Sequence, residues 1–237
     1  ARFGTAHRDV IRNYNLKTLS RIVPGWTEHN STVSSGRFED NIGYILITNW
    51  SWDNRDNLEP AFEMLDEYLD TKALIVDVRP NGGGDERVAG YFAGCFIDQP
   101  RVYAKHVYRD VHSPDGFSEP SERVVRPKKG RPKYRGKVAV LTGEAIMSSC
   151  EAFLLMMKQV PGCVLVGDRS FGSSGNPKPI QLSNGVVVYL PSWKAMRPDG
   201  TVFDGEGIEP DILVKAVESD FDSGDPVLEA ALESLRF

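Results

Sequence analysis

Residues 73–84 read ALIVDVRPNGGG, and this stretch decides the fold class. Its first half, residues 73–78, is a short apolar run of the length of one strand. Such a run is typical of a strand that is covered on both faces, as in parallel sheets. Three successive glycines at 82–84 end the strand, and the pattern from Glu86 to about Ile97 indicates a helix. The order of strand, glycine loop and helix is that of an α/β core.

The flanking segments repeat this alternation of strands and helices. Upstream, residues 42–48 predict a buried strand and residues 57–71 an amphipathic helix. Downstream, residues 137–142 predict a buried strand, residues 148–160 a helix and residues 164–166 a further strand. We therefore expect an α/β fold with a mixed sheet.

The last part of the chain indicates β structure. Residues 179–182 and 186–190 flank a Ser-Asn-Gly turn, and Asn-Gly between apolar runs is a strong hairpin signal. Residues 192–196 and 212–214 predict two more strands, and the Asp-Pro pair at 225–226 predicts the start of a final helix.

Two segments stand apart from this alternation. Residues 1–40 show no sustained apolar period, so we expect a lead-in segment, which could be the end of an upstream domain, before a core over residues 41–237. Residues 113–137 are rich in arginine and lysine and indicate a solvated surface excursion. The alternative for this excursion is a docking surface for an acidic partner.

The composition excludes several classes of protein. The 237 residues are 41% hydrophobic and 26% charged, as in an ordinary folded domain. A net charge of -5 argues against a general nucleic-acid binder. The longest apolar stretches are far shorter than the roughly 18 residues that a membrane span needs. Three cysteines are too few for a disulfide scaffold, and no spacing of metal ligands is present.

The glycine loop over residues 79–84 has three interpretations. Glycine accepts positive φ and lets the backbone approach a ligand closely. The N–H groups of such a bend can converge on one negative oxygen. The loop could therefore hold a phosphate, form an oxyanion hole, or be a tight turn without chemistry. The phosphate interpretation is weak, because no GxGxxG follows and no Gly-Lys-Ser/Thr ends the loop.

Ser148 lies where the strand 137–142 gives way to the next helix. A serine at that position is held on a sharp turn, and the helix N-terminus stabilises an oxyanion that develops beside it. The simpler interpretation is that Ser148 or Ser149 only caps the helix. Cys150 is a rival nucleophile, but nothing marks it as activated, and we expect it to pack in the interior.

A serine nucleophile needs a neighbouring base, and no residue is marked as one. The histidines lie outside any motif, and each is expected at the surface; they are His7, His29, His106 and His112. A lysine whose pKa is lowered by burial could serve instead. The lysines in this half of the chain carry no positional signal; they are Lys158, Lys178 and Lys194.

Five stretches occur in order along the chain: IGYILITNW (42–50), ALIVDVRPNGGG (73–84), KVAVLTGEAIMSSCEAF (137–153), VLVGDRSFGSSGNPKPIQLSNGVVVYLPSW (164–193) and PDGTVFDGEGIEPDI (198–212). Together they resemble the tail-specific or C-terminal-processing serine peptidases, and most closely their tricorn-type branch. The resemblance covers about residues 38–216. It implies a crotonase/Clp-protease-like core of stacked ββα units with a C-terminal β-rich segment.

The resemblance also implies site residues. Ser148 would be the nucleophile, at the start of the family's Ser-x-x-Glu pattern. The oxyanion hole would be formed by the N–H groups of Ser149 and of Gly84 or Gly83.

The base and the acid differ between branches of the family. The lysine-type branch carries its base in Phe-Gly-Lys-Gly, but here Ser173 occupies the lysine position, so this chain lacks that dyad. The tricorn-type branch uses a Ser-His pair from an upstream helical region. It also uses an acid, for which Asp204 and Glu206 are the candidates.

The resulting hypothesis is a serine peptidase that cleaves protein or peptide substrates, with a preference for sites near their C-termini and without cofactor. Its base would come from an upstream segment, beside upstream PDZ-like and helical domains, and an oligomer is compatible with the family. The segment 179–190 could bind an extended peptide by β-addition. A periplasmic or secreted location is expected from the resemblance alone, although tricorn-like members are cytosolic. Two alternatives stay open: a non-catalytic ligand- or peptide-binding module on the same fold, and an acyl-CoA enzyme of the crotonase group.

Overall fold

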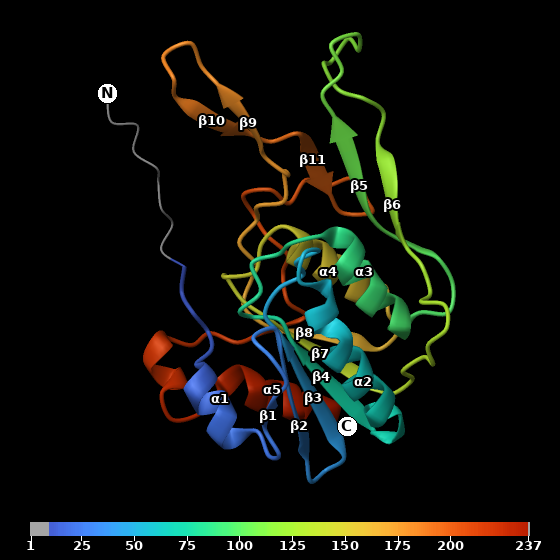
Figure 1. Ribbon diagram of the computed structural model, residues 1–237, viewed down its shortest axis with the longest axis vertical. Coiled ribbons are helices and arrows are strands. Elements are labelled where there is room, and N and C mark those ends of the chain that lie inside the picture. Colours follow the sequence, from blue (N-terminus) through green and yellow to red (C-terminus); the bar gives the residue numbers. More distant parts are fainter. Residues whose placement is uncertain (1–9, 237) are drawn as a thin grey trace.

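A seven-stranded mixed sheet forms the centre of the structure, a computed structural model that describes residues 10–236 (Figure 1). In spatial order its strands are β1 (Thr27–Glu28), β2 (Val33–Phe38), β3 (Ile42–Ile47), β4 (Ala73–Asp77), β7 (Lys137–Thr142), β8 (Cys163–Gly167) and β12 (Ile212–Leu213). The strands from β3 to β12 run parallel to one another. On the other side of β3, β2 pairs antiparallel with β3, and β1 pairs antiparallel with β2. The expected α/β fold with a mixed sheet is therefore confirmed.

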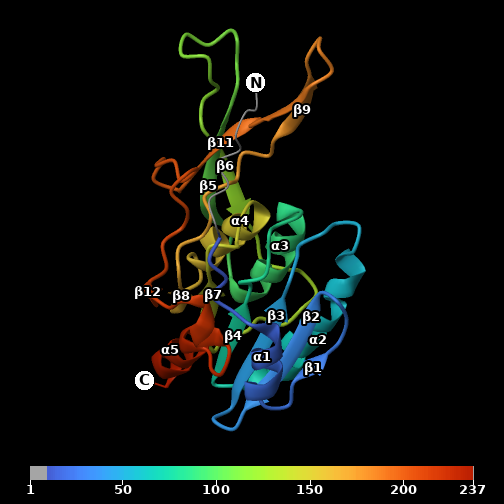
Figure 2. The ribbon, with the colours of Figure 1, turned by 90° about the vertical axis from the view of Figure 1, so that its left-hand side faces the viewer.

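Helices cover both faces of the sheet, because its central strands are apolar on both sides. Along β3, Ile45 and Ile47 belong to one core cluster and Tyr44 and Leu46 to the other, as the two-residue period of a strand requires. One face carries α2 (Glu59–Glu67), α3 (Glu86–Ala93) and α4 (Ser149–Met157), and the other carries α1 (Leu16–Ile22) and α5 (Pro226–Leu235) (Figure 2). Short 3-10 turns are η1 (Arg55–Leu58), η2 (Tyr68–Asp70), η3 (Gly94–Phe96) and η4 (Glu218–Phe221).

No helix within residues 10–236 combines the length and the apolar character that crossing a bilayer would demand.

Residues 16–38 contribute directly to this layered core. The side chain of Asn15 caps α1 by accepting hydrogen bonds from the N–H groups of Lys17 and Thr18. Strand β2 pairs with β3 along its whole length, and Leu19 of α1 is fully buried against the sheet. The segment expected as a lead-in thus supplies an edge of the sheet and a covering helix. The domain boundary expected at residue 40 stays a prediction.

Two further β elements extend beyond the helical layers (Figures 1 and 2). One is a three-stranded sheet of β5 (Arg101–Tyr108), β6 (Ser121–Val125) and β11 (Trp193–Met196) in the order β11-β5-β6. The other is the hairpin of β9 (Lys178–Gln181) and β10 (Val187–Leu190), which confirms the hairpin predicted from the Asn-Gly turn.

The basic excursion over residues 113–137 is more ordered than expected. It contains β6, and several of its cations form ion pairs with acids of the body. These pairs are Arg123–Glu86, Arg131–Asp66, Lys133–Asp98 and Arg135–Asp98. Much of its positive charge is therefore neutralised within the chain, which weakens the alternative of an acidic docking partner.

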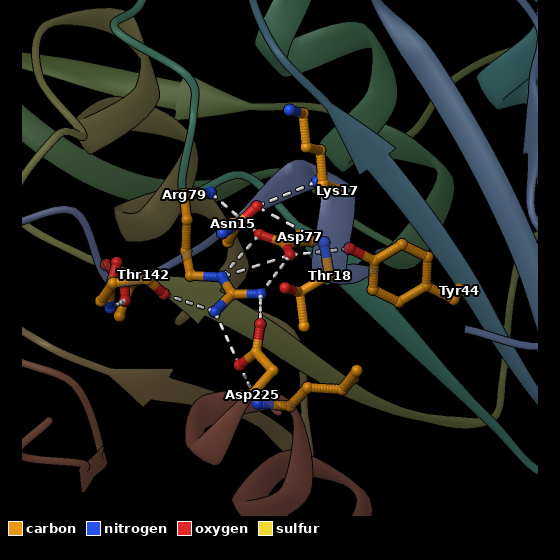
Figure 3. Close-up of polar contacts among 10 residues, drawn as sticks. Asn15, Lys17, Thr18, Tyr44, Asp77, Arg79, Thr142 and Asp225 are labelled. Carbon is orange, nitrogen blue, oxygen red and sulfur yellow. Dashed lines mark hydrogen bonds and ion pairs between the residues drawn. The ribbon is translucent and has the colours of Figure 1, made fainter. Parts of the chain in front are cut away.

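A buried ion-pair network holds the first residue of the glycine loop (Figure 3). The Arg79 side chain is fully buried, and its Nη2 donates to Asp77 Oδ2 at 2.6 Å and to Asp225 Oδ2 at 2.8 Å. Its Nη1 donates to the carbonyl of Asn13 at 2.6 Å, and the hydroxyl of Tyr44 donates to Asp77 Oδ2 at 2.7 Å. Asp225 is also the N-cap of α5. The network therefore joins the end of β4, the glycine loop and the C-terminal helix.

We expect Arg79→Met to lower the free energy of unfolding by about 3–5 kcal/mol, because it leaves Asp77 and Asp225 as buried charges without a partner. Arg37→Met is the matched control, since its ion pair with Asp70 is exposed and such pairs contribute less than about 1 kcal/mol. Urea denaturation of both variants measures the difference. Equal losses in the two variants would show that the buried network contributes no more to stability than the exposed ion pair of Arg37.

Candidate active site

Ser148 connects β7 to α4, and its backbone is strained. Its φ of 57° and ψ of -129° lie in a region that residues other than glycine rarely adopt. The surroundings impose this conformation: the Ser148 N–H donates to the carbonyl of Ser173 at 2.8 Å, and its own carbonyl accepts the N–H of Glu151 at 2.9 Å. Ser148 is the N-cap residue of α4, but its hydroxyl makes no capping hydrogen bond to the helix.

Parallel strands bring three loops together at one edge of the sheet. The segments that follow β3, β4 and β7 contain Trp50, the glycine loop and Ser148, respectively. In open parallel sheets, this carboxyl edge is where ligands bind. The topology of the fold thus explains why residues that are about one hundred positions apart meet.

The glycine loop lies directly against Ser148. A Cβ atom placed on Gly83 would stand 2.9 Å from the Cβ of Ser148 and 3.1 Å from the backbone nitrogen of Ser149. A Cβ atom on Gly84 would stand 2.4 Å from the carbonyl carbon of Trp50. Both glycines have positive φ, 109° and 141°. Only residues without a side chain permit this approach of the loop to the serine.

The hydrogen bonds of the loop distinguish the two candidate amides. The Gly83 N–H donates to Asn81 Oδ1 at 2.9 Å, so it is already engaged. Two hydrogen bonds form the β-bridge between Trp50 and the loop: the Trp50 N–H donates to the Gly83 carbonyl, and the Asp85 N–H donates to the Trp50 carbonyl. The N–H of Gly84 takes no part in this bridge. The Ser149 hydroxyl donates to the Gly84 carbonyl at 2.8 Å and ties the loop to the first turn of α4. This arrangement favours Gly84 over Gly83 as an oxyanion donor.

Glu151 anchors the loop that supports Ser148. Its buried carboxylate accepts hydrogen bonds from the hydroxyl groups of Ser170 and Ser174 and from the N–H groups of Gly172 and Ser173, at 2.6 to 2.9 Å. Burial raises the pKa of Glu151, and these hydrogen bonds oppose the rise. The carboxylate therefore holds the segment whose Ser173 carbonyl accepts the Ser148 N–H.

The two candidate acids differ in their surroundings. Asp204 Oδ1 accepts the N–H of Ser174 at 2.8 Å, and Ser174 lines the cavity beside Ser148. The side chain of Glu206 is 69% exposed, and its nearest cation is Arg197 at 4.0 Å. Asp204 is thus connected to the site through one residue, whereas Glu206 faces solvent.

A small cavity of about 30 Å³ adjoins the serine. Its lining residues are Glu86, Ala104, His106, Ser148, Ser149, Ala152, Leu155, Ser174, Trp193, Ala195 and Phe203. His106 is only 5% exposed, so the expectation of a surface position is wrong for this histidine. The sequence of β5 does not predict that His106 is buried, because both buried and exposed residues occur along this strand. The burial of His106 depends on the neighbouring strand β11, in which Ala195 lies opposite His106.

The remaining candidates lie away from this cavity. His7 lies outside the described residues, His112 is exposed, and His29 Nε2 is 2.8 Å from the hydroxyl of Ser35 on the β1–β2 side of the sheet. Among the lysines, Lys158 pairs with Asp211, Lys178 lies on the exposed hairpin, and Lys194 lies over the ring of Phe117.

Cys150 is fully buried in the core, as expected, and burial raises the pKa of its thiol.

Comparison with known sequences identifies the family. The model of peptidase family S41 matches residues 41–214. The carboxy-terminal processing protease CtpB of Bacillus subtilis is 26% identical over 186 residues, which are 78% of this chain and 36% of that protein. The tricorn protease of Thermoplasma acidophilum is 26% identical over 213 residues, which are 89% of this chain and 18% of that protein. The chain thus spans less than half the length of these relatives.

Solved structures support the same assignment. A crystal structure of a candidate peptidase from Parabacteroides merdae superposes with a TM-score of 0.83 at 25% identity, over 96% of this chain and 71% of that chain. Mature CPAF shares the fold with a TM-score of 0.70 at 18% identity, over 98% of this chain and 58% of that chain. Because the family model covers most of the sequence, this protein belongs to peptidase family S41.

Proposed function

We propose that this protein is a serine peptidase in which Ser148 attacks the scissile carbonyl of a peptide. The observation that carries the proposal is the strained Ser148 at the N-terminus of α4, in contact with the triple-glycine loop. This geometry places the half-buried Ser148 against the glycine loop, and acyl transfer requires a serine next to backbone amides. The acyl-CoA alternative has no comparable support from the sequence relatives.

The proposed oxyanion hole consists of the N–H groups of Gly84 and Ser149. Ser149 is the first residue of α4, so the helix dipole adds to the stabilisation of a negative oxygen there. Glu151 contributes by holding the 170–174 segment, and hence the backbone of Ser148, in place. These amides are preorganised before substrate binds, which is the property that stabilises a transition state.

The proton of Ser148 has to pass to a base, which we propose comes from a segment upstream of the core. Asp204 would orient that base through Ser174, since it holds the Ser174 N–H at 2.8 Å. The hydrogen-bonding pattern supports Asp204 over Glu206 in this role.

The proposed substrates are proteins or peptides that are cut near their C-termini. The names of the sequence relatives support this class, because CtpB and CtpA of Bacillus subtilis are carboxy-terminal processing proteases. The hairpin of β9 and β10 would pair with an extended substrate, and its exposed apolar residues, such as Ile180 and Tyr189, support this. Three further parts of the proposal rest on the family resemblance alone. They are upstream PDZ-like and helical domains, an oligomeric state, and a periplasmic or secreted location.

We expect Ser148→Ala to reduce peptide hydrolysis by the full-length protein by several orders of magnitude, because the other hydroxyls that line the cavity, those of Ser149 and Ser174, already donate to the Gly84 carbonyl and to Glu151. A fluorophosphonate probe should label the wild-type protein at Ser148 and fail to label the variant. Ser173→Ala is the matched control, since Ser173 contacts the site only through its backbone. If the probe does not label the wild-type protein, the result favours the alternative of a non-catalytic ligand- or peptide-binding module.

The glycine loop allows a second test with adjacent positions. We expect Gly83→Ala to reduce kcat/KM by about 10²–10³-fold, because the new methyl group would press on Ser148 and displace the oxyanion donors. Gly82→Ala is the control, because nothing lies within 4 Å of a Cβ atom at that position. Thermal unfolding separates a local effect on the site from a loss of fold. Similar kinetics of the two variants would argue against the proposed oxyanion hole.

A further inference from the structure

The polar groups of Ser174, next to the segment that supports Ser148, are held by three different residues. Its N–H donates to Asp204 Oδ1 at 2.8 Å, and its carbonyl accepts the indole N–H of Trp193 at 2.7 Å. Its hydroxyl donates to Glu151 Oε2 at 2.7 Å and lies 3.3 Å from the carbonyl oxygen of Ser148. With its donors and its carbonyl engaged, the backbone of Ser174 is fixed in one orientation.

The backbone of Ser174 connects Trp193 to Ser148. The Ser174 N–H and the Ser173 carbonyl belong to one peptide unit, and this carbonyl accepts the Ser148 N–H at 2.8 Å. Because a peptide unit is planar, a turn of either group moves the other. Trp193 holds the next peptide unit, through the Ser174 carbonyl. Only the two backbone rotations of Ser174 therefore lie between the unit that Trp193 holds and the unit that supports Ser148.

Trp193 is itself held by the three-stranded sheet. It is the first residue of β11 and pairs in register with Tyr108 of β5. Its indole ring stacks on the imidazole of His106 with 4.7 Å between ring centroids and an interplanar angle of 18°. The ring of Tyr108 meets it edge-on at 6.0 Å. Aromatic contacts of this kind have a defined geometry, so the indole N–H is directed at the Ser174 carbonyl by a packed side chain.

The Ser174 carbonyl depends on this one donor. Within residues 10–236, it accepts no hydrogen bond other than that from Trp193. Ser174 is half-buried and lines the cavity beside Ser148. Without the indole N–H, the carbonyl would turn toward another donor, and the support of the Ser148 backbone would shift with it. A misplacement of a reacting group by about 1 Å can cost about 10²-fold in rate.

We propose that Trp193 is a positioning residue for the reaction, and that its indole N–H holds Ser148 in the geometry of attack through the backbone of Ser174. The proposal rests on the proposed peptidase function. Because Trp193 acts through the protein backbone, its N–H contributes to the chemical step more than to the binding of substrate. The sheet of β5, β6 and β11 thereby takes part in the chemistry, besides lining the cavity beside Ser148.

The test compares tryptophan variants of the full-length protein. Trp193→Phe removes the indole N–H and keeps an aromatic ring beside His106. Trp26→Phe is the matched control, because the Trp26 indole nitrogen has no hydrogen-bond partner within residues 10–236 and its ring packs near Tyr44 in the other core cluster. A second variant replaces Trp193 with benzothienylalanine, which has nearly the shape of tryptophan and carries sulfur in place of the N–H.

We expect kcat to fall about tenfold in Trp193→Phe and in the benzothienylalanine variant, the effect of one lost hydrogen bond, with KM nearly unchanged. The rate constant for fluorophosphonate labelling of Ser148 should fall by the same factor, because this probe reports the reactivity of the serine without the contacts of a peptide. Both quantities should stay at the wild-type value in Trp26→Phe. Active-site titration with the probe distinguishes slower chemistry from partial unfolding, which lowers only the fraction of competent protein.

The outcomes separate this inference from the function on which it rests. If the wild-type protein neither cleaves peptides nor reacts with the probe, the peptidase proposal is wrong, and the role of Trp193 falls with it. If the wild-type protein is active and both Trp193 variants keep its kcat and labelling rate, only the positioning role is overturned. A higher KM with unchanged kcat would make Trp193 a substrate-binding residue instead. An equal fall of kcat in Trp26→Phe would likewise overturn the role of the N–H.

Discussion

The buried contact of Arg79 with Asp77 and Asp225 is the constraint on which the rest of the structure depends. An arginine without exposure is tolerated only when its charge and its N–H groups are fully partnered. Here the partners come from the end of β4 and from the N-cap of the last helix. The glycine loop begins at Arg79, so its starting point is fixed by groups distant in the chain. The Arg79 contacts thus hold the start of the loop whose glycines approach Ser148.

A second set of contacts opposes the strain at Ser148. The conformation of this residue is unfavourable in isolation, by about 1–3 kcal/mol. Glu151, one turn into α4, holds the 170–174 segment through hydroxyl and amide donors, and that segment returns a carbonyl to the Ser148 N–H. The position that the lysine-type branch fills with a base is therefore used here as structural support, through the backbone of Ser173. The replacement of the lysine by Ser173 thus goes together with a structural role of the Ser173 backbone in this loop.

The candidate site is assembled from two layers that the sequence presents separately. The sheet supplies Ser148 and the amides, and the β5–β11 pair supplies His106 and Trp193. The first layer suits bond-breaking chemistry, and the second lines the cavity beside Ser148.

The sequence by itself determined the core strands, the Asn-Gly hairpin, the helix that begins after Asp225, and the identity of Ser148 and the glycine loop as candidates. These follow from local signals: apolar runs, turn residues and caps act over a few positions. Sequence patterns did not reveal β5 and β6, the contribution of α1 and β2 to the core, the anchoring role of Glu151, or the burial of His106. Only the tertiary structure decided these, because they depend on which distant strand or loop packs against a residue. A histidine on a mixed strand is buried or exposed according to its neighbour in space, and here that neighbour is Trp193, 87 positions further along the chain.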